Sequence, residues 1–207
     1  MIALVDYGMG NLRSAAKALE RVGARVEITS DPMRVRAADA VVLPGVGAFG
    51  RCMENLRTAG LEAVVREAAH SARPFLGICV GMQILFEESE EFGPVAGLGI
   101  LPGRVRRFPA TELKVPHMGW NELRVGRRAP HLDGIEDGAY VYFVHSYVVD
   151  CDVSTLAATT TPYGAPFVSS VWRDNLFATQ FHPEKSQAVG LRLLANFARL
   201  AGESARS

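Results

Sequence analysis

The stretch that decides the fold is residues 75–83, FLGICVGMQ. Residues 75–78 form the short apolar run typical of a buried strand. Gly77 and Gly81 flank Cys79 at the spacing of the nucleophile elbow, G-x-S-x-G, with cysteine in place of serine. In that elbow a strand turns sharply into a helix, and small residues are needed on both sides of the strained nucleophile. The pattern predicts a strand, a nucleophile at the turn and a helix over about 80–88.

A cysteine at such a turn points outward at a helix N-terminus, whose partial positive charge favours the thiolate. The main-chain N–H of Val80 points to the same place, and we expect it to stabilise an oxyanion. Cys79 is therefore the candidate nucleophile. The other two cysteines, Cys52 in a predicted helix and Cys151 in a predicted loop, are interpreted as buried structural residues or as incidentally exposed ones.

Outward from this stretch, the N-terminal half alternates apolar runs with amphipathic segments. The expected strands are 2–5, 26–29, 41–43 and 75–78, and the expected helices are 11–22, 49–70 with a break near Gly60, and 80–88. We expect Asn11 to cap the first helix and Gly23 to end it. This alternation is typical of a parallel sheet covered by helices on both faces.

The C-terminal half has a different pattern. Its expected strands are 105–108, 140–147, 156–160, 168–172 and 176–180, and a last helix is expected over about 187–201. The short loops between these strands, rich in Gly, Pro and Asp, indicate antiparallel hairpins. We predict the α/β class: a doubly wound, mostly parallel sheet with helices on both faces plus an antiparallel β extension. At this length the chain, residues 1–207, is expected to form a single domain.

The composition indicates an ordinary globular protein that works on small molecules. Hydrophobic residues make up 48%, and 22 basic residues balance 22 acidic ones. Neither a nucleic-acid footprint nor an anionic-membrane surface is indicated, and no apolar run approaches the roughly 18 residues of a membrane span. Three cysteines without metal-ligand spacing argue against a disulfide framework or a zinc site. We expect a cytoplasmic protein that uses no metal or cofactor.

The base that serves Cys79 must be a histidine brought close by the fold. His182 has the best context, because Glu184 follows two residues on and can orient the imidazole. His145, within a predicted strand, is the alternative base. Two further histidines are interpreted as surface residues, namely His70 and His131.

An oxyanion hole needs two donors, and the elbow supplies one. The second must come from the loop after a neighbouring strand. Residues 44–47, PGVG, fit because glycines on both sides of Val46 let a peptide unit rotate at low steric cost. Rotation of this loop would let a partner gate the activity. The alternative is a rigid Pro-Gly turn that merely ends a strand.

Six segments spread over nearly the whole chain form a recognisable set. They are 6–12 (DYGMGNL), 44–49 (PGVGAF), 77–83 (GICVGMQ), 116–121 (PHMGWN), 142–147 (YFVHSY) and 180–186 (QFHPEKS). The chain resembles the class I (triad) glutamine amidotransferases, and within them the HisH family, the glutaminase subunits of imidazole glycerol phosphate synthase. Met82, where several relatives have histidine, favours this subfamily. Val80 departs from the commoner leucine, but it is the main-chain N–H that acts there.

The resemblance implies a flavodoxin-like fold and a Cys79–His182–Glu184 triad that hydrolyses the side-chain amide of glutamine. His182 is implied to protonate the departing ammonia and then to activate water against a glutamyl thioester. The implied oxyanion residues are Val46, Gly47 and Val80, and the implied glutamine contacts are Gly47, Gln83, Glu91, His145, Ser146 and Tyr147. Without the resemblance, Glu91 is better interpreted as a solvated charge in an acidic run.

The chain has no room for a synthase domain, so the chemistry that uses the ammonia must lie on another polypeptide. The resemblance implies a HisF-like (β/α)₈-barrel cyclase, which makes imidazole glycerol phosphate and AICAR in histidine biosynthesis. Trp120, Tyr142 and Lys185 are expected to face it; the alternatives are core packing for the two aromatics and simple solvation for the lysine. The other functions left open are a glutaminase subunit of another amidotransferase, a stand-alone cysteine hydrolase and a degenerate binding module.

Overall fold

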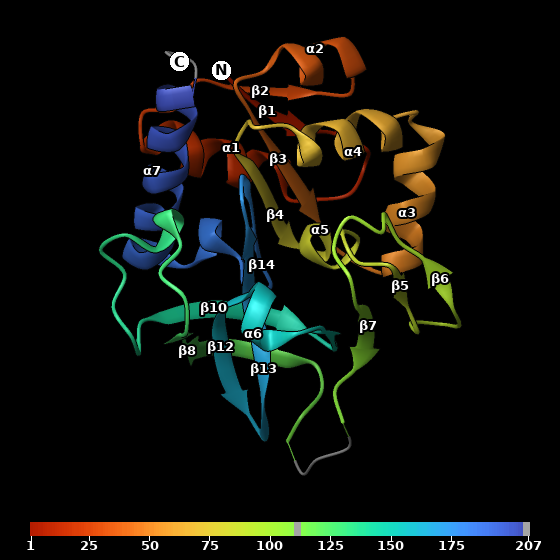
Figure 1. Ribbon diagram of the computed structural model, residues 1–207, viewed down its shortest axis with the longest axis vertical. Coiled ribbons are helices and arrows are strands. Elements are labelled where there is room, and N and C mark those ends of the chain that lie inside the picture. Colours follow the sequence, from red (N-terminus) through yellow and green to blue (C-terminus); the bar gives the residue numbers. More distant parts are fainter. Residues whose placement is uncertain (110–112, 205–207) are drawn as a thin grey trace.

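The computed structural model describes residues 1–109 and 113–204, and its main feature is a long sheet whose upper part in Figure 1 is covered by helices. The sheet has eight strands in the order β2-β1-β3-β4-β14-β13-β12-β9. Their bounds are Ile2–Val5 (β1), Val26–Thr29 (β2), Ala40–Gly45 (β3), Phe75–Cys79 (β4), Arg124–Val125 (β9), Ala157–Tyr163 (β12), Ala165–Arg173 (β13) and Leu176–Thr179 (β14). The first five strands in this order run parallel, and the last three extend the sheet antiparallel.

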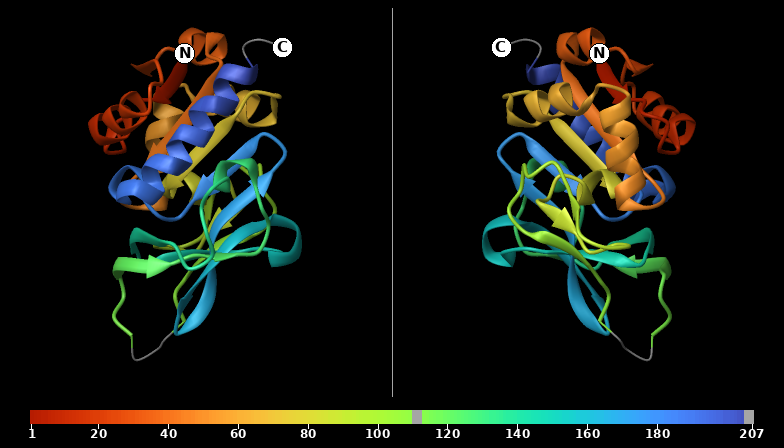
Figure 2. Two further views of the ribbon diagram at one scale, coloured as in Figure 1. Left: turned by 90° about the vertical axis from the view of Figure 1, so that its left-hand side faces the viewer. Right: turned by 90° about the vertical axis from the view of Figure 1, so that its right-hand side faces the viewer.

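Helices cover both faces of the parallel half. α1 and α7 pack together on one face, and α2, α3 and α4 lie on the other (Figures 1 and 2). The bounds are Leu12–Arg21 (α1), Pro32–Ala37 (α2), Phe49–Thr58 (α3), Glu62–His70 (α4), Val80–Gln83 (α5), Val153–Leu156 (α6) and Gln187–Ser204 (α7), with 3₁₀ turns at Pro130–Leu132 (η1) and Pro183–Lys185 (η2). None of the helices described is both long and apolar enough to cross a membrane.

Two smaller sheets accompany the antiparallel extension, and β8 and β10 lie in the lower half of the molecule in Figure 1. One is the pair β10-β8, and the other has the order β11-β7-β5-β6. The bounds are Glu88–Ser89 (β5), Val95–Ala96 (β6), Arg104–Arg107 (β7), His117–Glu122 (β8), Tyr140–His145 (β10) and Tyr147–Asp150 (β11). The predicted fold class, with its parallel sheet and antiparallel extension, is confirmed.

Burial follows the two kinds of sheet. Every residue of β1, β3, β4 and β14 is buried, because helices or neighbouring layers cover both faces of these strands. β8 instead mixes buried and exposed positions, with buried His117 at its start followed by exposed Met118. The central strands are therefore a rigid platform, and the site lies at their carboxyl ends.

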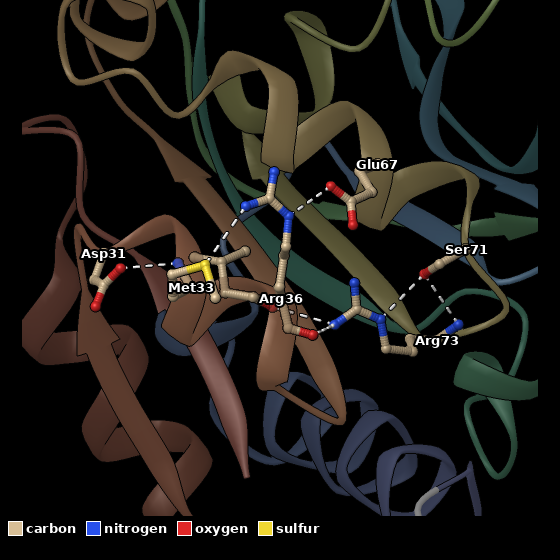
Figure 3. A network of polar contacts seen from close by, with 7 residues as sticks. Asp31, Met33, Arg36, Glu67, Ser71 and Arg73 are labelled. Carbon is tan, nitrogen blue, oxygen red and sulfur yellow. Dashed lines mark hydrogen bonds and ion pairs between the residues drawn. The ribbon is translucent and has the colours of Figure 1, made fainter.

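Arg73 fixes the entrance to β4 (Figure 3). Its Nη1 donates hydrogen bonds to the carbonyl oxygens of Val35, Arg36 and Ala38, at 3.2, 2.7 and 2.8 Å. These carbonyls lie at the C-terminal end of α2, where a helix runs out of its own donors, although that of Val35 also accepts from the N–H of Ala38 at 3.4 Å. Arg36 also pairs with Glu67 of α4 at 2.8 Å, so that α2, α4 and the start of β4 are tied together.

The prediction of a helix over 80–88 is wrong, since α5 stops at Gln83. The next carbonyls bond across to a distant loop instead of along a helix. The carbonyl oxygen of Ile84 accepts from the N–H of Leu98 at 2.7 Å, and that of Leu85 accepts from Ile100 at 2.8 Å. The helix thus ends early because N–H groups of the distant 98–100 loop take these carbonyls as hydrogen-bond acceptors.

Two predictions about single residues are also wrong. Asn11 stands at the N-cap position of α1 but makes no side-chain capping bond. His131 is buried, not at the surface, and stacks on Phe177 with ring centroids 4.5 Å apart. His70 is exposed as predicted, and Gly23 follows the end of α1 with φ +87°.

Candidate active site

The turn at Cys79 has the predicted elbow geometry. Cys79 ends β4 with φ 55° and ψ −114°, in the region that residues other than glycine rarely adopt. A Cβ at Gly81 would overlap the carbonyl oxygen of Leu43, and one at Gly77 would lie 3.0 Å from the Cβ of Ala178. Gly81 therefore has to be glycine, and Gly77 leaves very little room for any side chain. The strain is held by strands packed on either side of the turn.

β14 brings the histidine to this turn. It pairs in parallel with β4, with Thr179 opposite Ile78, so the residues after Thr179 arrive beside the elbow. His182 is 2% exposed, and its Nδ1 lies 2.8 Å from Oε1 of Glu184, whose side chain is 3% exposed. This contact fixes Nδ1 as the protonated nitrogen, because a carboxylate only accepts. Nε2 is buried and has no hydrogen-bond partner among the described residues.

The surroundings of His182 favour its charged form. Burial lowers its pKa, but the interactions with Cys79 and Glu184 outweigh burial and raise the pKa to about 10. A thiolate at Cys79 and an imidazolium at His182 would stabilise each other. This is the arrangement of a cysteine nucleophile activated by an adjacent base.

A cavity of about 410 Å³ opens over the elbow. It is lined by Val46, Gly47, Cys79, Val80, Gln83, Glu91, Pro116, Val144, His145, Ser146, Tyr147, His182 and Lys185. The predicted nucleophile, base, oxyanion residues and glutamine contacts thus line one space. Glu184 lies behind His182 and does not line the cavity.

The backbone of the 44–47 loop is tied to buried side chains. The hydroxyl of Tyr7 donates to the carbonyl oxygen of Pro44 at 2.6 Å, and the thiol of Cys52 donates to that of Val46 at 3.4 Å. Burial raises the pKa of Cys52 to about 11, which keeps it a neutral donor. Gly47 has φ +83°, a conformation that suits glycine.

Glu91 is not simply a solvated charge. Its Oε2 accepts a hydrogen bond from the N–H of Phe49 at 2.7 Å, at the first turn of α3. Ala48, at the N-cap position, has no side chain that could do this. Glu91 therefore caps α3 from 42 residues away, and it lines the cavity at the same time.

The contacts of His145 argue against the alternative in which it is the base. Its Nδ1 lies 2.9 Å from the carbonyl oxygen of Tyr147, and its Nε2 lies 3.0 Å from Nδ1 of His117. Both ring nitrogens are occupied. Burial lowers the pKa of His145 to about 3 and that of His117 to about 4, so both are neutral.

Comparison with known proteins decides the family. Residues 3–200 match the family described as Glutamine amidotransferase class-I. The chain is 54% identical to the imidazole glycerol phosphate synthase subunit HisH of Syntrophotalea carbinolica, over 95% of this chain and 98% of that one. It is also 54% identical to the HisH subunit of Nitrosococcus oceani, over 98% and 99% of the two chains.

The chain belongs to the class-I glutamine amidotransferases, and within them to the HisH family. Its fold agrees: a solved glutamine amidotransferase superposes with a TM-score of 0.75 at 22% identity, covering 98% of this chain and 100% of that one. The subfamily resemblance seen in the six sequence segments is confirmed.

Sequence analysis of this amidotransferase assigned no role to Gln180, which the structure places at the nucleophile. Gln180 is fully buried, and its Nε2 lies 3.7 Å from Sγ of Cys79. The signal in the sequence was its place at the end of the predicted strand 176–180. In the structure Gln180 stands one position beyond the pair that joins Thr179 to Ile78, and so it comes level with Cys79.

The three residues predicted to face a partner lie together beside the cavity. Trp120 and Tyr142 are paired across β8 and β10, with ring centroids 6.2 Å apart, and Nζ of Lys185 lies 5.8 Å from the Tyr142 ring. Trp120 is 45% exposed, which excludes core packing for it. The main chain of Tyr142 also holds the triad segment: its carbonyl oxygen accepts from the N–H of His182 at 3.0 Å.

Proposed function

We propose that this amidotransferase, acting as one domain over residues 1–207, hydrolyses glutamine to glutamate and ammonia with a Cys79–His182–Glu184 triad. The observation that carries the proposal is the state of His182. Its Nδ1 is bound to a buried carboxylate, and its Nε2, which has no hydrogen-bond partner among the described residues, lies at a cavity that also holds Cys79.

The reaction has two halves. The Cys79 thiolate attacks the side-chain carbonyl carbon of glutamine, and the C–N bond breaks as the His182 imidazolium gives its Nε2 proton to the departing ammonia. Water then attacks the thioester carbon while His182 takes a proton from it, and the C–S bond breaks to release glutamate and restore the thiolate. Glu184 keeps the imidazole in the required tautomer throughout.

The oxyanion formed in each half needs two donors. We assign one to the N–H of Val80 and the second to the Val46–Gly47 segment, both of which line the cavity. A partner that biases the 44–47 loop would gate the rate. One missing donor costs roughly 10²–10³ in rate.

For the substrate's α-amino and carboxylate region, Gln83 and Glu91 are the candidates with the main chain of 145–147. Nε2 of Gln83 is already bound to the carbonyl oxygen of Tyr147, at 3.1 Å. Oε1, the oxygen of the same side-chain amide, is therefore the atom of Gln83 that can accept from an ammonium group. Glu91 adds negative charge beside it.

We further propose that the ammonia passes to a HisF-like (β/α)₈-barrel cyclase, in a heterodimer that makes imidazole glycerol phosphate and AICAR in the cytoplasm. The relatives of this chain are named as subunits of imidazole glycerol phosphate synthase, which implies a partner subunit. The exposed aromatic face of the β8–β10 pair supports this docking site. It carries Met118, Trp120 and Tyr140, which are 63%, 45% and 56% exposed.

The test is glutamine hydrolysis by the lone chain, by the complex with the cyclase, and by the complex with its acceptor nucleotide. We expect the rate to rise in that order. Equal rates in all three would contradict gating and favour a stand-alone hydrolase.

Cys79→Ala should abolish glutamine hydrolysis and leave the cyclase active with added ammonium salt. Cys151→Ala is the matched control, because Cys151 lies outside the cavity, and it should behave like the parent. Substantial glutaminase activity in Cys79→Ala would eliminate the proposed mechanism.

A further inference from the structure

A single backbone carbonyl fixes the orientation of two buried amides beside the nucleophile. The carbonyl oxygen of Tyr147 lies 2.9 Å from Nδ1 of His145 and 3.1 Å from one terminal atom of Gln83. A carbonyl only accepts hydrogen bonds. The Gln83 atom that faces it must therefore be the nitrogen, Nε2.

The same nitrogen determines how Gln180 is turned. Nε2 of Gln83 lies 2.9 Å from a terminal atom of Gln180, to which it gives its second proton. That atom must be the oxygen, Oε1, because two amide nitrogens would oppose donor to donor. Nε2 of Gln180 then points the other way, to Sγ of Cys79 at 3.7 Å.

Burial makes this orientation costly to reverse. Gln83 is 4% exposed and Gln180 is fully buried, so water cannot replace a partner that Gln180 loses. The main chain of Gln180 is also fixed, since its N–H donates to the carbonyl oxygen of Ser169 at 2.9 Å. If the Gln180 amide were reversed, its oxygen would face the sulfur, and the partial negative charge of that oxygen would repel a thiolate.

We propose that Gln180 donates one N–H to the sulfur of Cys79 and thereby stabilises the thiolate that attacks glutamine. This inference rests on the proposed role of Cys79 and adds a residue to that site. The sulfur then has two partners: His182, which is charged, and Gln180, which is a neutral donor. The hydrogen bonds between Tyr147 and Gln83 and between Gln83 and Gln180 set the direction of that donor. A hydrogen bond to a charged group is stronger than one to a neutral group, so this contact strengthens when the thiol ionises.

The other titratable groups that interact with Cys79 are His182, Tyr7 and Cys52. They come from separate elements, and none of them contacts Gln180 through a hydrogen bond that the structure describes. Substitution of Gln180 therefore changes the donor and leaves these charges in place.

The experiment measures the reaction of Cys79 with iodoacetamide in the isolated chain from pH 5 to pH 10, scored by mass spectrometry on the peptide that contains Cys79. Gln180→Met keeps the side-chain length and removes the donor. We expect the midpoint of its pH profile to rise by about one pH unit, at the lower end for hydrogen bonds to charged groups because sulfur is a weak acceptor.

A second signature separates donor loss from general disturbance. A more basic thiolate is more nucleophilic, with a Brønsted slope of about 0.4–0.5, so the high-pH plateau should rise about threefold while the rate below the midpoint falls about threefold. Gln180→Glu keeps the acceptor for Gln83 but places a carboxylate oxygen at the sulfur, and its midpoint should rise further than that of Gln180→Met.

Thr179→Val is the matched control. Thr179 is fully buried one residue away, and its hydroxyl donates to the carbonyl oxygen of Phe181 at 2.9 Å without contact to the sulfur. Its profile should match the parent's. An unchanged midpoint in both Gln180 variants, with a folded chain by circular dichroism, would overturn the proposal, as would an equal shift in Thr179→Val.

This experiment is independent of the test of function, because alkylation needs neither glutamine nor a partner. If Cys79→Ala kept its glutaminase activity, the proposed function would fail while the alkylation profiles still reported on Gln180. If the profiles did not move, Gln180 would lose its role and the triad would stand.

Discussion

Two buried histidines line the same cavity, and their surroundings favour opposite protonation states. His182 and His145 are almost equally buried, at 2% and 6% exposed. His182 lies against the Glu184 carboxylate and the Cys79 thiol, and its pKa rises to about 10. His145 lies between a carbonyl and another neutral imidazole, and burial lowers its pKa to about 3. Burial alone makes a histidine neutral, so the neighbours decide which one can exchange protons.

The contacts of the two histidines also suit them to two different tasks, proton transfer and the positioning of neighbouring groups. A histidine with a carboxylate behind it and an open nitrogen in front can transfer protons. A histidine with both nitrogens occupied can only hold its neighbours in place. The neutral chain runs from Asn121 through His117 and His145 to the carbonyl oxygen of Tyr147. It ends on the atom that also orients Gln83.

The largest expected effect is on proton transfer. His182→Ala should lower the rate of glutamine hydrolysis about 10⁴-fold or more, because triad members act as a unit. His145 remains in this variant, and its occupied nitrogens should prevent it from taking over. The measurement is single-turnover glutamine hydrolysis in the complex with the cyclase. A loss of less than tenfold would mean that the two histidines are not as different as their contacts indicate.

Glu184→Gln should have a smaller effect: the factor by which it lowers the rate of glutamine hydrolysis should be about 100 times smaller than that of His182→Ala. The amide can still contact Nδ1 of His182, but it does not stabilise the imidazolium and can favour the wrong tautomer. The pH dependence of kcat/KM should change as well, since the carboxylate raises the pKa of His182. Equal losses in the two variants would mean that Glu184 does more than orient the ring.

The neutral histidines should make the fold sensitive to acid. Burial lowers the pKa of His117 and His131 to about 4 and that of His145 to about 3. Unfolded chains bind these protons near pH 6.5, so the stability from the three neutral rings is complete above pH 6.5 and is lost as pH falls towards 4. At pH 5.5 the loss is roughly 4 kcal/mol if all three stay neutral in the fold.

His182 has the opposite sign, because its pKa is raised. Its contribution is complete below pH 6.5 and disappears as pH rises towards 10. Urea denaturation at pH 7.5 and pH 5.5 measures the acid effect. Between these two pH values His182 gains roughly 1.4 kcal/mol, which leaves a net acid loss of roughly 3 kcal/mol. His131→Phe is the control: neither ring nitrogen of His131 has a hydrogen-bond partner among the described residues, so phenylalanine should reduce the net pH dependence by about half without unfolding the chain. A flat stability between the two pH values would contradict the assigned neutral states.

The smallest expected effect is that of His145→Phe. It should lower the free energy of unfolding by about 1–3 kcal/mol, because partners on His117 and Tyr147 lose their hydrogen bonds. It should change kcat less than tenfold. Denaturation and steady-state glutaminase assays together provide the test, and a kcat loss near that of His182→Ala would show that His145 transfers protons after all.

The sequence predicted that Cys79 and His182 would meet at one site, but it did not predict the chain of neutral histidines beside them. Cys79 and His182 stand in short local patterns whose chemistry is readable from the residues next to them: two flanking glycines in one case, a following acid in the other. The strands were predictable for the same reason, since buried parallel strands are continuous apolar runs.

The neutral chain and Gln180 depend on pairs far apart in the sequence. Gln83 and Gln180 are separated by 97 residues, and His117 and His145 by 28. No local period predicts which polar residues will meet once the sheets are packed. The burial of His131 and the early end of α5 were missed for the same reason, because aromatic stacking and cross-loop hydrogen bonds overrode the local pattern.

β14 stands between β3–β4 and the antiparallel extension, although it is the last strand to be synthesised. Until it emerges from the ribosome, the nascent chain has an open apolar edge along β4 and a thiol with neither its histidine nor its glutamine neighbour. Such an edge is an aggregation hazard. We therefore expect a polypeptide that ends before residue 176 to expose this edge and to lack glutaminase activity.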